Sequence, residues 1–312
     1  MRVRRWTQIA GTLLANPWFA YLSTRTIYQG RVKGICFPGF NCYACPLAMM
    51  SCPIGSLQQS LTLISPNKSA SAAGGAFGQV ARQAATNSIG ALLYVLGFIG
   101  IVGVVSGRLV CGWICPFGFL QDLLYKIPSP KLKLPRFMRY GKYVMLAVLA
   151  MLIPYLTGVH WYSRLCPAGS LEGALPLEAI PPRASLPPIG WFFWLKIGIL
   201  VFFLAWMVVT KRPFCRTACA LGAAYAILTP VSLYRMHVDS TCDGCEKCRE
   251  VCPVDISIYE NANSPECVRC LDCKKECPVG AVSSGFRLGL TGGEEDEPLP
   301  EKGTVEKEGG KH

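Results

Sequence analysis

Four apolar segments dominate the pattern of hydrophobic and polar positions along the chain. They cover residues 6–23, 89–105, 143–159 and 191–210. Gln8, Asn16 and Pro17 interrupt the first segment, whereas the other three contain few polar residues. Each segment is close to the ~20 residues that a helix needs to cross ~30 Å of hydrocarbon. The pattern therefore predicts a membrane protein with about four transmembrane α-helices.

Lysine and arginine gather on one side of these predicted spans. They precede the first segment, follow the fourth, and number seven in the loop after the second, where Asp122 is the only acid. The loop between the third and fourth segments has only Arg164 and Arg183, balanced by Glu172 and Glu178. The positive-inside rule then places both chain termini in the cytoplasm. We expect a multi-pass protein of a bacterial or archaeal cell (inner) membrane.

The composition supports this class and argues against a nucleic-acid partner. Of the 312 residues, 51% are hydrophobic and only 16% are charged, which is typical of chains with long apolar segments. The formal net charge is +12. However, the basic residues fall between the apolar segments rather than on one basic face, so we expect no nucleic acid to bind.

Eight of the seventeen cysteines form two adjoining ferredoxin signatures near the C-terminus. Each reads Cys-x2-Cys-x2-Cys-x3-Cys-Pro, the bacterial run in which the fourth cysteine ligates the other cluster. This spacing assigns cluster I to Cys242, Cys245, Cys248 and Cys277. It assigns cluster II to Cys267, Cys270, Cys273 and Cys252. Zinc is a weak alternative, because structural zinc sites lack the doubled run.

A short phrase opened by cysteine recurs four times outside these signatures. The first three copies are Cys52-Pro-Ile-Gly-Ser-Leu-Gln58, Cys115-Pro-Phe-Gly-Phe-Leu-Gln121 and Cys166-Pro-Ala-Gly-Ser-Leu-Glu172. The fourth, Cys219-Ala-Leu-Gly-Ala-Ala-Tyr225, lacks the proline. The predicted ligand Cys277 opens a related run. Proline stops a helix and glycine lets the backbone approach a cluster. We infer that these phrases also hold clusters, on short re-entrant or interfacial helices.

The predicted topology sorts eight further cysteines into two sets of four. The outer thiol set is Cys42, Cys45, Cys52 and Cys166. The inner thiol set is Cys111, Cys115, Cys215 and Cys219. One cubane takes four thiolates, so each set predicts one more [4Fe–4S] cluster. Cys36 has no assigned role and is an alternative outer ligand. Disulfides in the outer set, or free thiols, are the competing interpretation.

The two sets present a problem of distance. Sites on opposite faces of a ~30 Å core are too far apart for direct electron transfer. We expect segments after the phrases to fold inward, or a quinone or a partner's cofactor to bridge the gap.

No residue has the setting of a catalytic acid, base or nucleophile, and no flavin or phosphate-binding motif is present. His160 is expected to lie at the membrane interface rather than to ligate a metal. We expect His237 to be a linker residue rather than a donor to a cluster sulfur. Lys196 is expected to reach outward along its span, with a role at a quinone site as the alternative.

The C-x3-C pairs at Cys111–Cys115 and Cys215–Cys219, followed by the ferredoxin signatures, resemble the membrane-bound 4Fe–4S polyferredoxin family. That family includes the quinol-linked membrane ferredoxin of periplasmic nitrate reductase systems. It also includes the membrane component of methylamine dehydrogenase maturation and copper-reducing assembly factors of haem–copper oxidases. The cysteine motif at 38–46 resembles a subgroup with an extra N-terminal motif. Ala220 departs from the family's proline, and no flavin domain precedes the spans.

We therefore expect three parts: a four-span membrane domain over 1–235, a cytoplasmic α+β ferredoxin domain with two clusters over 236–286, and a disordered tail over 287–312. Residues 65–78 are expected to form a flexible loop.

The predicted function is that of an electron-transfer subunit in anaerobic metabolism, not a stand-alone catalyst. It passes electrons between a cytoplasmic donor or acceptor, such as a soluble ferredoxin, and the quinone pool or a membrane or periplasmic partner in a redox complex. One alternative is a maturation factor that reduces a metal ion or thiol for another metalloenzyme. Another is a redox sensor whose membrane cysteines bind no cluster.

Overall fold

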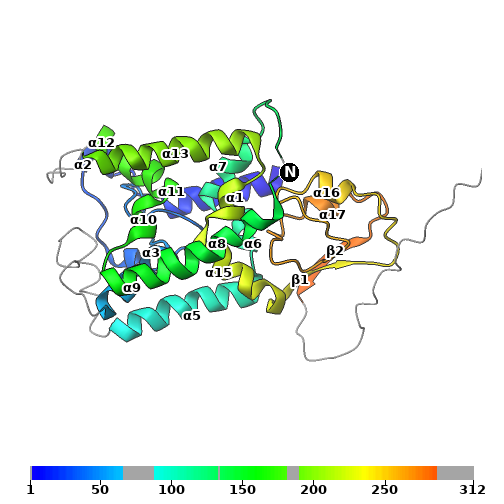
Figure 1. Ribbon diagram of the computed structural model, residues 1–312, viewed down its shortest axis with the longest axis horizontal. Helices are drawn as coiled ribbons and strands as arrows, with labels where there is room; N and C mark the ends of the chain where they lie inside the picture. Colours follow the sequence, from blue (N-terminus) through cyan, green and yellow to red (C-terminus); the bar gives the residue numbers. More distant parts are fainter. Residues whose placement is uncertain (1, 66–87, 133, 181–189, 287–312) are drawn as a thin grey trace, which may run out of the picture.

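The computed structural model of the protein describes residues 2–65, 88–132, 134–180 and 190–286. The expected tail over 287–312 and nearly all of the expected flexible loop over 65–78 lie outside the described residues. The described chain forms a bundle of long helices with a small module at one end (Figure 1). We call residues 234–286 the C-terminal module.

Three helices in the described chain are long and apolar enough to cross a membrane. The first is α5 (Ser88–Ser106) and the third is α13 (Trp191–Val209). The second is a continuous run of η3 (Arg136–Tyr140), α8 (Gly141–Val144), η4 (Met145–Leu152) and α9 (Ile153–Thr157). Only 11–17% of each span is buried within the protein. Their apolar side chains are therefore left to face hydrocarbon.

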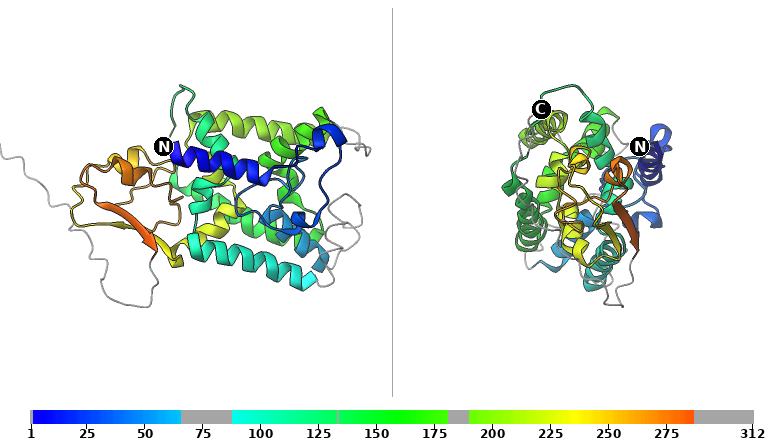
Figure 2. Two further views of the ribbon diagram at one scale, coloured as in Figure 1. Left: turned by 180° about the vertical axis from the view of Figure 1, so that it is seen from behind. Right: turned by 90° about the vertical axis from the view of Figure 1, so that its right-hand side faces the viewer.

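The first expected span is not confirmed. Its residues form α1 (Arg2–Ala15), a helix of 14 residues, and the short α2 (Tyr21–Thr24). Pro17 explains the break, because proline has no N–H and disfavours helical backbone at the preceding residue. Helix α1 lies along the bundle (Figure 2). It buries two polar side chains, Arg4 and Gln8, against the rest of the protein.

Short helices contain, directly precede or directly follow six of the nine cysteines of the membrane part. These helices are α3 (Pro53–Ile64), α6 (Leu109–Trp113), α7 (Pro116–Leu124), α10 (Trp161–Leu165), α11 (Pro167–Gly169), α14 (Pro213–Thr217) and α15 (Ala220–Leu228). The remaining short elements are η1 (Arg31–Gly34), η5 (Ser170–Ala174), α12 (Leu175–Ala179) and η6 (Thr229–Val231). Helices α11, η5 and α12 follow one another without a break, so the cysteine before them heads a continuous helical run.

An antiparallel pair of strands closes the C-terminal module. Strand β1 (Tyr234–Val238) pairs with β2 (Val282–Phe286), with Tyr234 opposite Phe286. His237 lies opposite Ser283 in this pair. It is therefore a strand residue, and the expectation of a linker residue was wrong.

The module repeats its backbone conformation around its two signatures. Helices α16 (Lys247–Glu250) and α17 (Asp272–Glu276) begin 25 residues apart, the same offset as Cys242 and Cys267. Each follows a residue in the left-handed region, Glu246 with φ 58° and Leu271 with φ 63°. The two halves of the module thus turn in the same way.

A buried ion cluster joins the module to the membrane helices. The side chains of Arg108 and Lys142 are fully buried, and both form ion pairs with the carboxylate of Glu266. Arg108 Nη1 lies 3.1 Å from Glu266 Oε2 and also donates to the carbonyl oxygen of Pro265. Burial alone raises the pKa of Glu266, but the two cations outweigh burial and lower it. One carboxylate is therefore paired with two buried cations.

Replacing Glu266 with Ala should leave Arg108 and Lys142 without their anion. Removing one partner of a buried ion pair costs about 3–5 kcal/mol, so the variant should unfold at markedly lower denaturant concentration in lipid nanodiscs. Glu276→Ala on the exposed side of α17 is the matched control and should behave as wild type. Equal stability of the two variants would contradict the assigned role of Glu266.

Candidate iron–sulfur sites

Each repeated phrase folds in the same way around its cysteine. Cys52, Cys115, Cys166 and Cys219 have extended backbone, with φ between −66° and −75° and ψ between 106° and 128°, and each directly precedes a helix. Such a position puts the sulfur at a helix N-terminus, where free N–H groups and the helix dipole stabilise a thiolate. The phrase is therefore a local device for holding an anionic sulfur.

The glycine of the phrase supplies a hydrogen bond to that sulfur. Gly118 N lies 3.4 Å from Cys115 Sγ, and Gly222 N lies 3.2 Å from Cys219 Sγ. A Cβ on Gly118 would lie 2.9 Å from the carbonyl oxygen of Cys111, so this position has no room for a side chain. The fourth phrase keeps this geometry although Ala220 replaces the proline.

The inner thiol set lies together between α6, α7, α14 and α15. All four side chains are buried, with exposed fractions of 4–7%. Burial is the main cause that raises the pKa of Cys115, and the neighbouring thiols of Cys215 and Cys111 raise it further. The pKa of Cys219 is raised in the same way, and all three other thiols contribute. Gln121, in the helix that follows Cys115, donates to Cys215 Sγ at 2.9 Å, so the two C-x3-C pairs lie side by side in one buried site.

Two buried arginines brace this site, and the sequence analysis missed them. Arg108 and Arg212 each precede the first cysteine of a C-x3-C pair by three residues, and their exposed fractions are 0% and 1%. Arg108 Nη2 donates to the carbonyl oxygen of Cys215 at 3.2 Å. Arg212 Nη1 donates to the carbonyl oxygen of Cys111 at 3.0 Å. Each arginine thus reaches across to the other pair. Their equal spacing was the signal that could have identified them.

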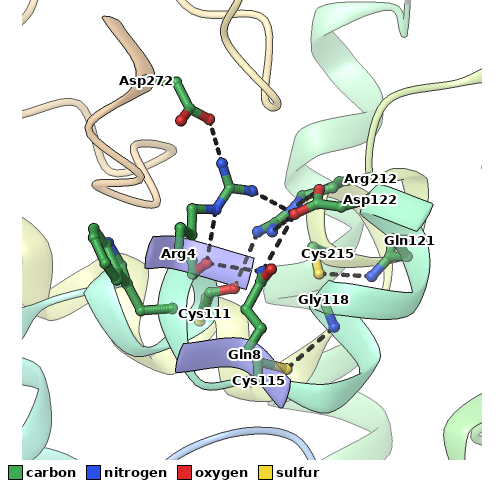
Figure 3. A network of polar contacts seen from close by, with 12 residues as sticks. Arg4, Gln8, Cys111, Cys115, Gly118, Gln121, Asp122, Arg212, Cys215 and Asp272 are labelled. Carbon is green, nitrogen blue, oxygen red and sulfur yellow. Dashed lines mark hydrogen bonds and ion pairs between the residues drawn. The ribbon is translucent and has the colours of Figure 1, made fainter. Parts of the chain in front are cut away.

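Figure 3 follows the contacts of Arg212 outward from the inner site. Arg212 forms an ion pair with Asp122, which also contacts Arg4 of α1, and Arg4 contacts Asp272 of the C-terminal module. Burial, the largest single cause, lowers the pKa of Arg212. Asp122 and the thiols of Cys215 and Cys270 raise it, and together they outweigh burial. A buried guanidinium therefore lies between the inner site and the second signature.

The C-terminal end of α6, which follows Cys111, lies directly against the module. A Cβ on Gly112 would lie 2.4 Å from the carbonyl oxygen of Val268 and 3.7 Å from Cys270 Cα. Trp113 Nε1 donates to the carbonyl oxygen of Arg269 at 2.9 Å. The backbone of the second signature and that of the inner site are therefore in contact.

The module brings its cysteines together as the crossed assignment predicts. One small cavity is lined by all four predicted ligands of cluster I, including Cys277 from the second signature. A second cavity is lined by all four predicted ligands of cluster II, including Cys252 from the first signature, and also by Cys248. Four thiols around a cavity fit an iron–sulfur cubane, whose ligation by these residues stays a prediction.

The outer thiol set forms a chain of neighbours. Cys42 lies near Cys166, since a Cβ on Gly169 would lie 3.6 Å from Cys42 Sγ and 3.8 Å from Cys166 Cβ. Cys45 contributes to raising the pKa of Cys42, and Cys52 contributes to raising the pKa of Cys166. Burial is the main cause that raises the pKa of each of these thiols.

Cys36 lies at the edge of the outer set. Its exposed fraction is 2%, and Ser51 Oγ lies 3.8 Å from its sulfur. Burial is the main cause that raises the pKa of Cys52, and the neighbouring thiol of Cys36 raises it further. The structure therefore places Cys36 where it is an alternative to Cys45 as the fourth outer thiol.

The seventh residue of each phrase is a second feature that the sequence analysis missed. Gln121 Nε2 donates to Cys215 Sγ at 2.9 Å, within the inner set. Glu172 Oε2 accepts from Cys42 N at 2.6 Å, within the outer set. Gln58 Oε1 accepts from Ser163 N at 3.2 Å, just before Cys166. A polar residue at this fixed position ties each of these phrases to another segment of its own set.

The two sets approach each other inside the bundle. The segment between Cys36 and Cys42 folds inward, so that Phe40 N donates to Cys115 Sγ at 3.4 Å. A Cβ on Gly39 would lie 3.1 Å from Cys115 Cα. The expectation of an inward fold concerned segments after the phrases, whereas the segment observed to do so precedes the first phrase.

A cavity of about 370 Å³ adjoins the outer thiol set. Its lining includes Cys42, Cys52 and Cys166, together with His160 and Lys196. Lys196 is half-buried and lines this space from the third long helix, α13.

All seventeen cysteines, every one within the described ranges, are free thiols. In the same part of the chain, no group of three or more His, Cys, Asp or Glu side chains is placed to hold a single metal ion. A cubane has an iron at each thiolate, so its ligands lie further apart than those of one ion.

Comparison with known proteins places these sites in a family context. The 4Fe-4S binding domain family matches residues 88–135 and 191–234. Each matched segment contains one long helix and one C-x3-C pair, with a buried arginine three residues before the pair. The chain resembles the membrane-bound 4Fe–4S polyferredoxins.

Three relatives show the extent of this resemblance. An uncharacterized protein of Methanocaldococcus jannaschii is 29% identical over 61% of this chain and 77% of its own length. The methylamine utilization ferredoxin-type protein MauN of Methylorubrum extorquens is 32% identical over 53% of this chain and 52% of its own length. The ferredoxin-type protein NapH of Haemophilus influenzae is 30% identical over 53% of both chains. The match thus spans about half the length of the two named relatives. No solved structure matches the chain significantly.

The polyferredoxin resemblance that the cysteine motifs predict is therefore confirmed. The chain is similar to ferredoxin-type iron–sulfur proteins, and three helices in its described part are long and apolar enough to cross a membrane.

Replacing Cys115 with Ser should remove the cluster of the inner thiol set. Total iron should then fall by about four atoms per chain, because one cubane contains four irons. The measurement is iron and acid-labile sulfide on purified protein. Cys36→Ser is the comparison, and it should leave the iron content unchanged if Cys45 completes the outer set. An unchanged iron content in Cys115→Ser would remove this residue as a ligand.

Proposed function

We propose that the protein is a membrane electron-transfer subunit with four [4Fe–4S] clusters. It passes electrons between a cytoplasmic donor or acceptor and a quinone or a membrane or periplasmic redox partner. The observation that carries this proposal is the contact of Gly112 with the backbone of Val268 and Cys270. That contact gives electrons a short path between the C-terminal module and the buried inner site.

The proposed ligands are the sets expected from the sequence. Cluster I takes Cys242, Cys245, Cys248 and Cys277, and cluster II takes Cys267, Cys270, Cys273 and Cys252. The inner and outer thiol sets take one cluster each. When bound, the clusters accept and release single electrons. The chain's own part is to bury the sulfurs, to donate N–H hydrogen bonds to them and to supply the counter-charges of Arg108 and Arg212.

The proposed topology has the N-terminus and the C-terminal module on the cytoplasmic side of the cell membrane. The ion pair between Arg4 and Asp272 supports this, because it holds both at the same end of the bundle. The basic loop after α5 also lies at that end (Figure 1). Cytoplasmic excess of lysine and arginine is the general rule for membrane proteins.

The cavity beside the outer thiol set is the proposed quinone site. Its volume of about 370 Å³ lies in the range of ligand pockets, which are mostly apolar with a few polar groups. His160 and Lys196 are such polar groups, and three outer thiols line the same space. This lining favours the quinone-site alternative for Lys196 over an outward-reaching side chain.

Counting iron tests the number of clusters. Four cubanes predict about sixteen irons per chain, and two predict about eight. Electron paramagnetic resonance (EPR) of the reduced protein should give four signals in the first case. About eight irons would refute the membrane clusters and leave the module intact.

Replacing Gly112 with Val tests the path between the module and the inner site. The added side chain would meet the carbonyl oxygen of Val268, so the module must move away. Transfer from the reduced module to the inner site should slow, while total iron stays at the wild-type value. Gly97→Val is the matched control, because a Cβ there meets no atom within 4 Å. An unchanged rate in Gly112→Val would contradict the proposed path.

Replacing Lys196 with Leu tests the cavity. Reduction of the protein by a short-chain quinol should become slower, because the pocket loses a polar group that orients the quinone head. Reduction by dithionite and the iron content should not change. Lys274→Leu on the exposed face of α17 serves as the control. If both variants accept electrons from quinol at the wild-type rate, the cavity is not the quinone site. A wild-type protein that reduces Cu(II) but not quinone would favour the maturation alternative.

A further inference from the structure

Two buried tyrosines connect the inner thiol set with the outer one. Tyr162 belongs to α10, which leads into Cys166, and its exposed fraction is 5%. Tyr225 belongs to α15, which Cys219 caps, and its exposed fraction is 0%. Each side chain extends from one set toward the backbone of the other.

Tyr162 holds the backbone on both sides of Cys219. Its hydroxyl donates to the carbonyl oxygen of Ala218 at 3.2 Å. The same hydroxyl accepts a hydrogen bond from Ala220 N at 3.0 Å. A tyrosine four residues before an outer cysteine is therefore fixed to the two neighbours of an inner cysteine.

Tyr225 makes the reverse connection. Its hydroxyl donates to the carbonyl oxygen of Pro38 at 3.0 Å. Pro38 belongs to the segment that runs from Cys36 to Cys42 and that also contacts Cys115 through Phe40. Burial is the main cause that raises the pKa of both tyrosines. Thiols of both sets also contribute, with Cys219 and Cys166 acting on Tyr162 and Cys111 and Cys52 acting on Tyr225.

Both connections depend on positions where the fourth phrase departs from the other three. The second residue is proline in the other phrases, and proline has no N–H. Only Ala220 can donate to Tyr162. The seventh residue is Gln or Glu in the other phrases, and none of its hydrogen bonds goes to a segment of the other set. Only Tyr225, at the seventh position of the fourth phrase, reaches across to the other set.

We propose that Tyr162 and Tyr225 are positioning residues that set the rate of electron exchange between the inner and outer clusters. Ala220 supports Tyr162 in this position, because its N–H donates to the tyrosine hydroxyl. The proposal rests on the proposed function, because it requires a cluster in each set. When bound, the clusters held by the inner and outer thiol sets would exchange single electrons, while Tyr162 and Tyr225 hold the backbone around Cys219 and at Pro38. No bond forms or breaks and no proton moves, because the tyrosines stay protonated and neutral throughout.

The test measures exchange between the two membrane clusters in the full chain. The protein is photoreduced in nanodiscs by an excited ruthenium complex that serves as the electron donor. Rapid freeze-quench EPR then follows the inner and outer signals, which are assigned with Cys115→Ser and Cys166→Ser. Tyr162→Leu and Tyr225→Leu remove the rings. Exchange should slow by roughly tenfold or more, because small changes of separation and packing have large effects on such rates.

Iron content, EPR line shapes and midpoint potentials should stay at their wild-type values, which a purely structural role would not predict. Ala220→Pro removes one hydrogen bond to Tyr162 while restoring the sequence of the other phrases, and should slow exchange to a smaller extent. Tyr225→Gln likewise restores the usual seventh residue and should slow exchange. Tyr155→Leu is the control, since Tyr155 is 42% exposed on the second span.

If the leucine variants lose iron, Tyr162→Phe and Tyr225→Phe decide the question, because they keep the rings and remove only the hydroxyl contacts. Wild-type exchange in variants with full iron content would overturn the proposal. About eight irons in the wild-type protein would instead refute the membrane clusters themselves, so the two failures are distinguishable.

Discussion

The main constraint on this structure is the burial of many sulfurs that carry negative charge when they bind metal. A charge inside an apolar interior is costly unless it has counter-charges and hydrogen-bond donors. Next to the inner thiol set, the rings of Phe40, Phe117 and Phe214 pack at centroid distances of 5.0–6.3 Å, and Phe40 N donates to Cys115 Sγ. The aromatic rings provide no counter-charge and no N–H donor. Helix N-termini and glycine N–H groups donate to the sulfurs, and two guanidinium groups provide positive charge. The positions of α7, α15 and both C-x3-C helices follow from this need.

The same arginines explain why the C-terminal module is fixed to the bundle. A buried guanidinium itself needs an anion, and neither Arg108 nor Arg212 can rely on thiols alone. Arg108 takes Glu266 from the module, and Arg212 takes Asp122, which connects through Arg4 to Asp272. Balancing the charge of the inner site therefore also positions the second signature against it. Stability and the proposed electron path depend on the same ion pairs.

The sequence predicted the parts that follow from local patterns. Three long helices follow from uninterrupted apolar runs, and the shared backbone around the four phrases follows from a repeated cysteine, proline and glycine. Hydropathy and charge also sorted the thiols into inner and outer sets, and the ligation of clusters by these sets stays a prediction. The first expected span was not confirmed, because the helix ends before Asn16 and Pro17 and the apolar residues that follow form only the short α2. The sequence alone does not show the roles of two buried arginines, Arg108 and Arg212, or of the seventh residue of each phrase. They depend on contacts between segments about a hundred residues apart.

The burial of the thiols also constrains where the proposed path can meet its partners. The inner set is at most 7% exposed, so no soluble protein can approach it closely. Cys245 of the first signature is exposed, whereas Cys267 and Cys270 of the second are buried against the bundle. Under the proposed function, a soluble partner would therefore meet the first half of the C-terminal module, and cluster II and the inner site would serve as intermediate carriers. At the far end, the cavity beside Cys42 and Cys166 is the place where a small molecule can reach the outer set. Under the proposed function, this order makes the protein a conduit with one protein-facing end and one ligand-facing end.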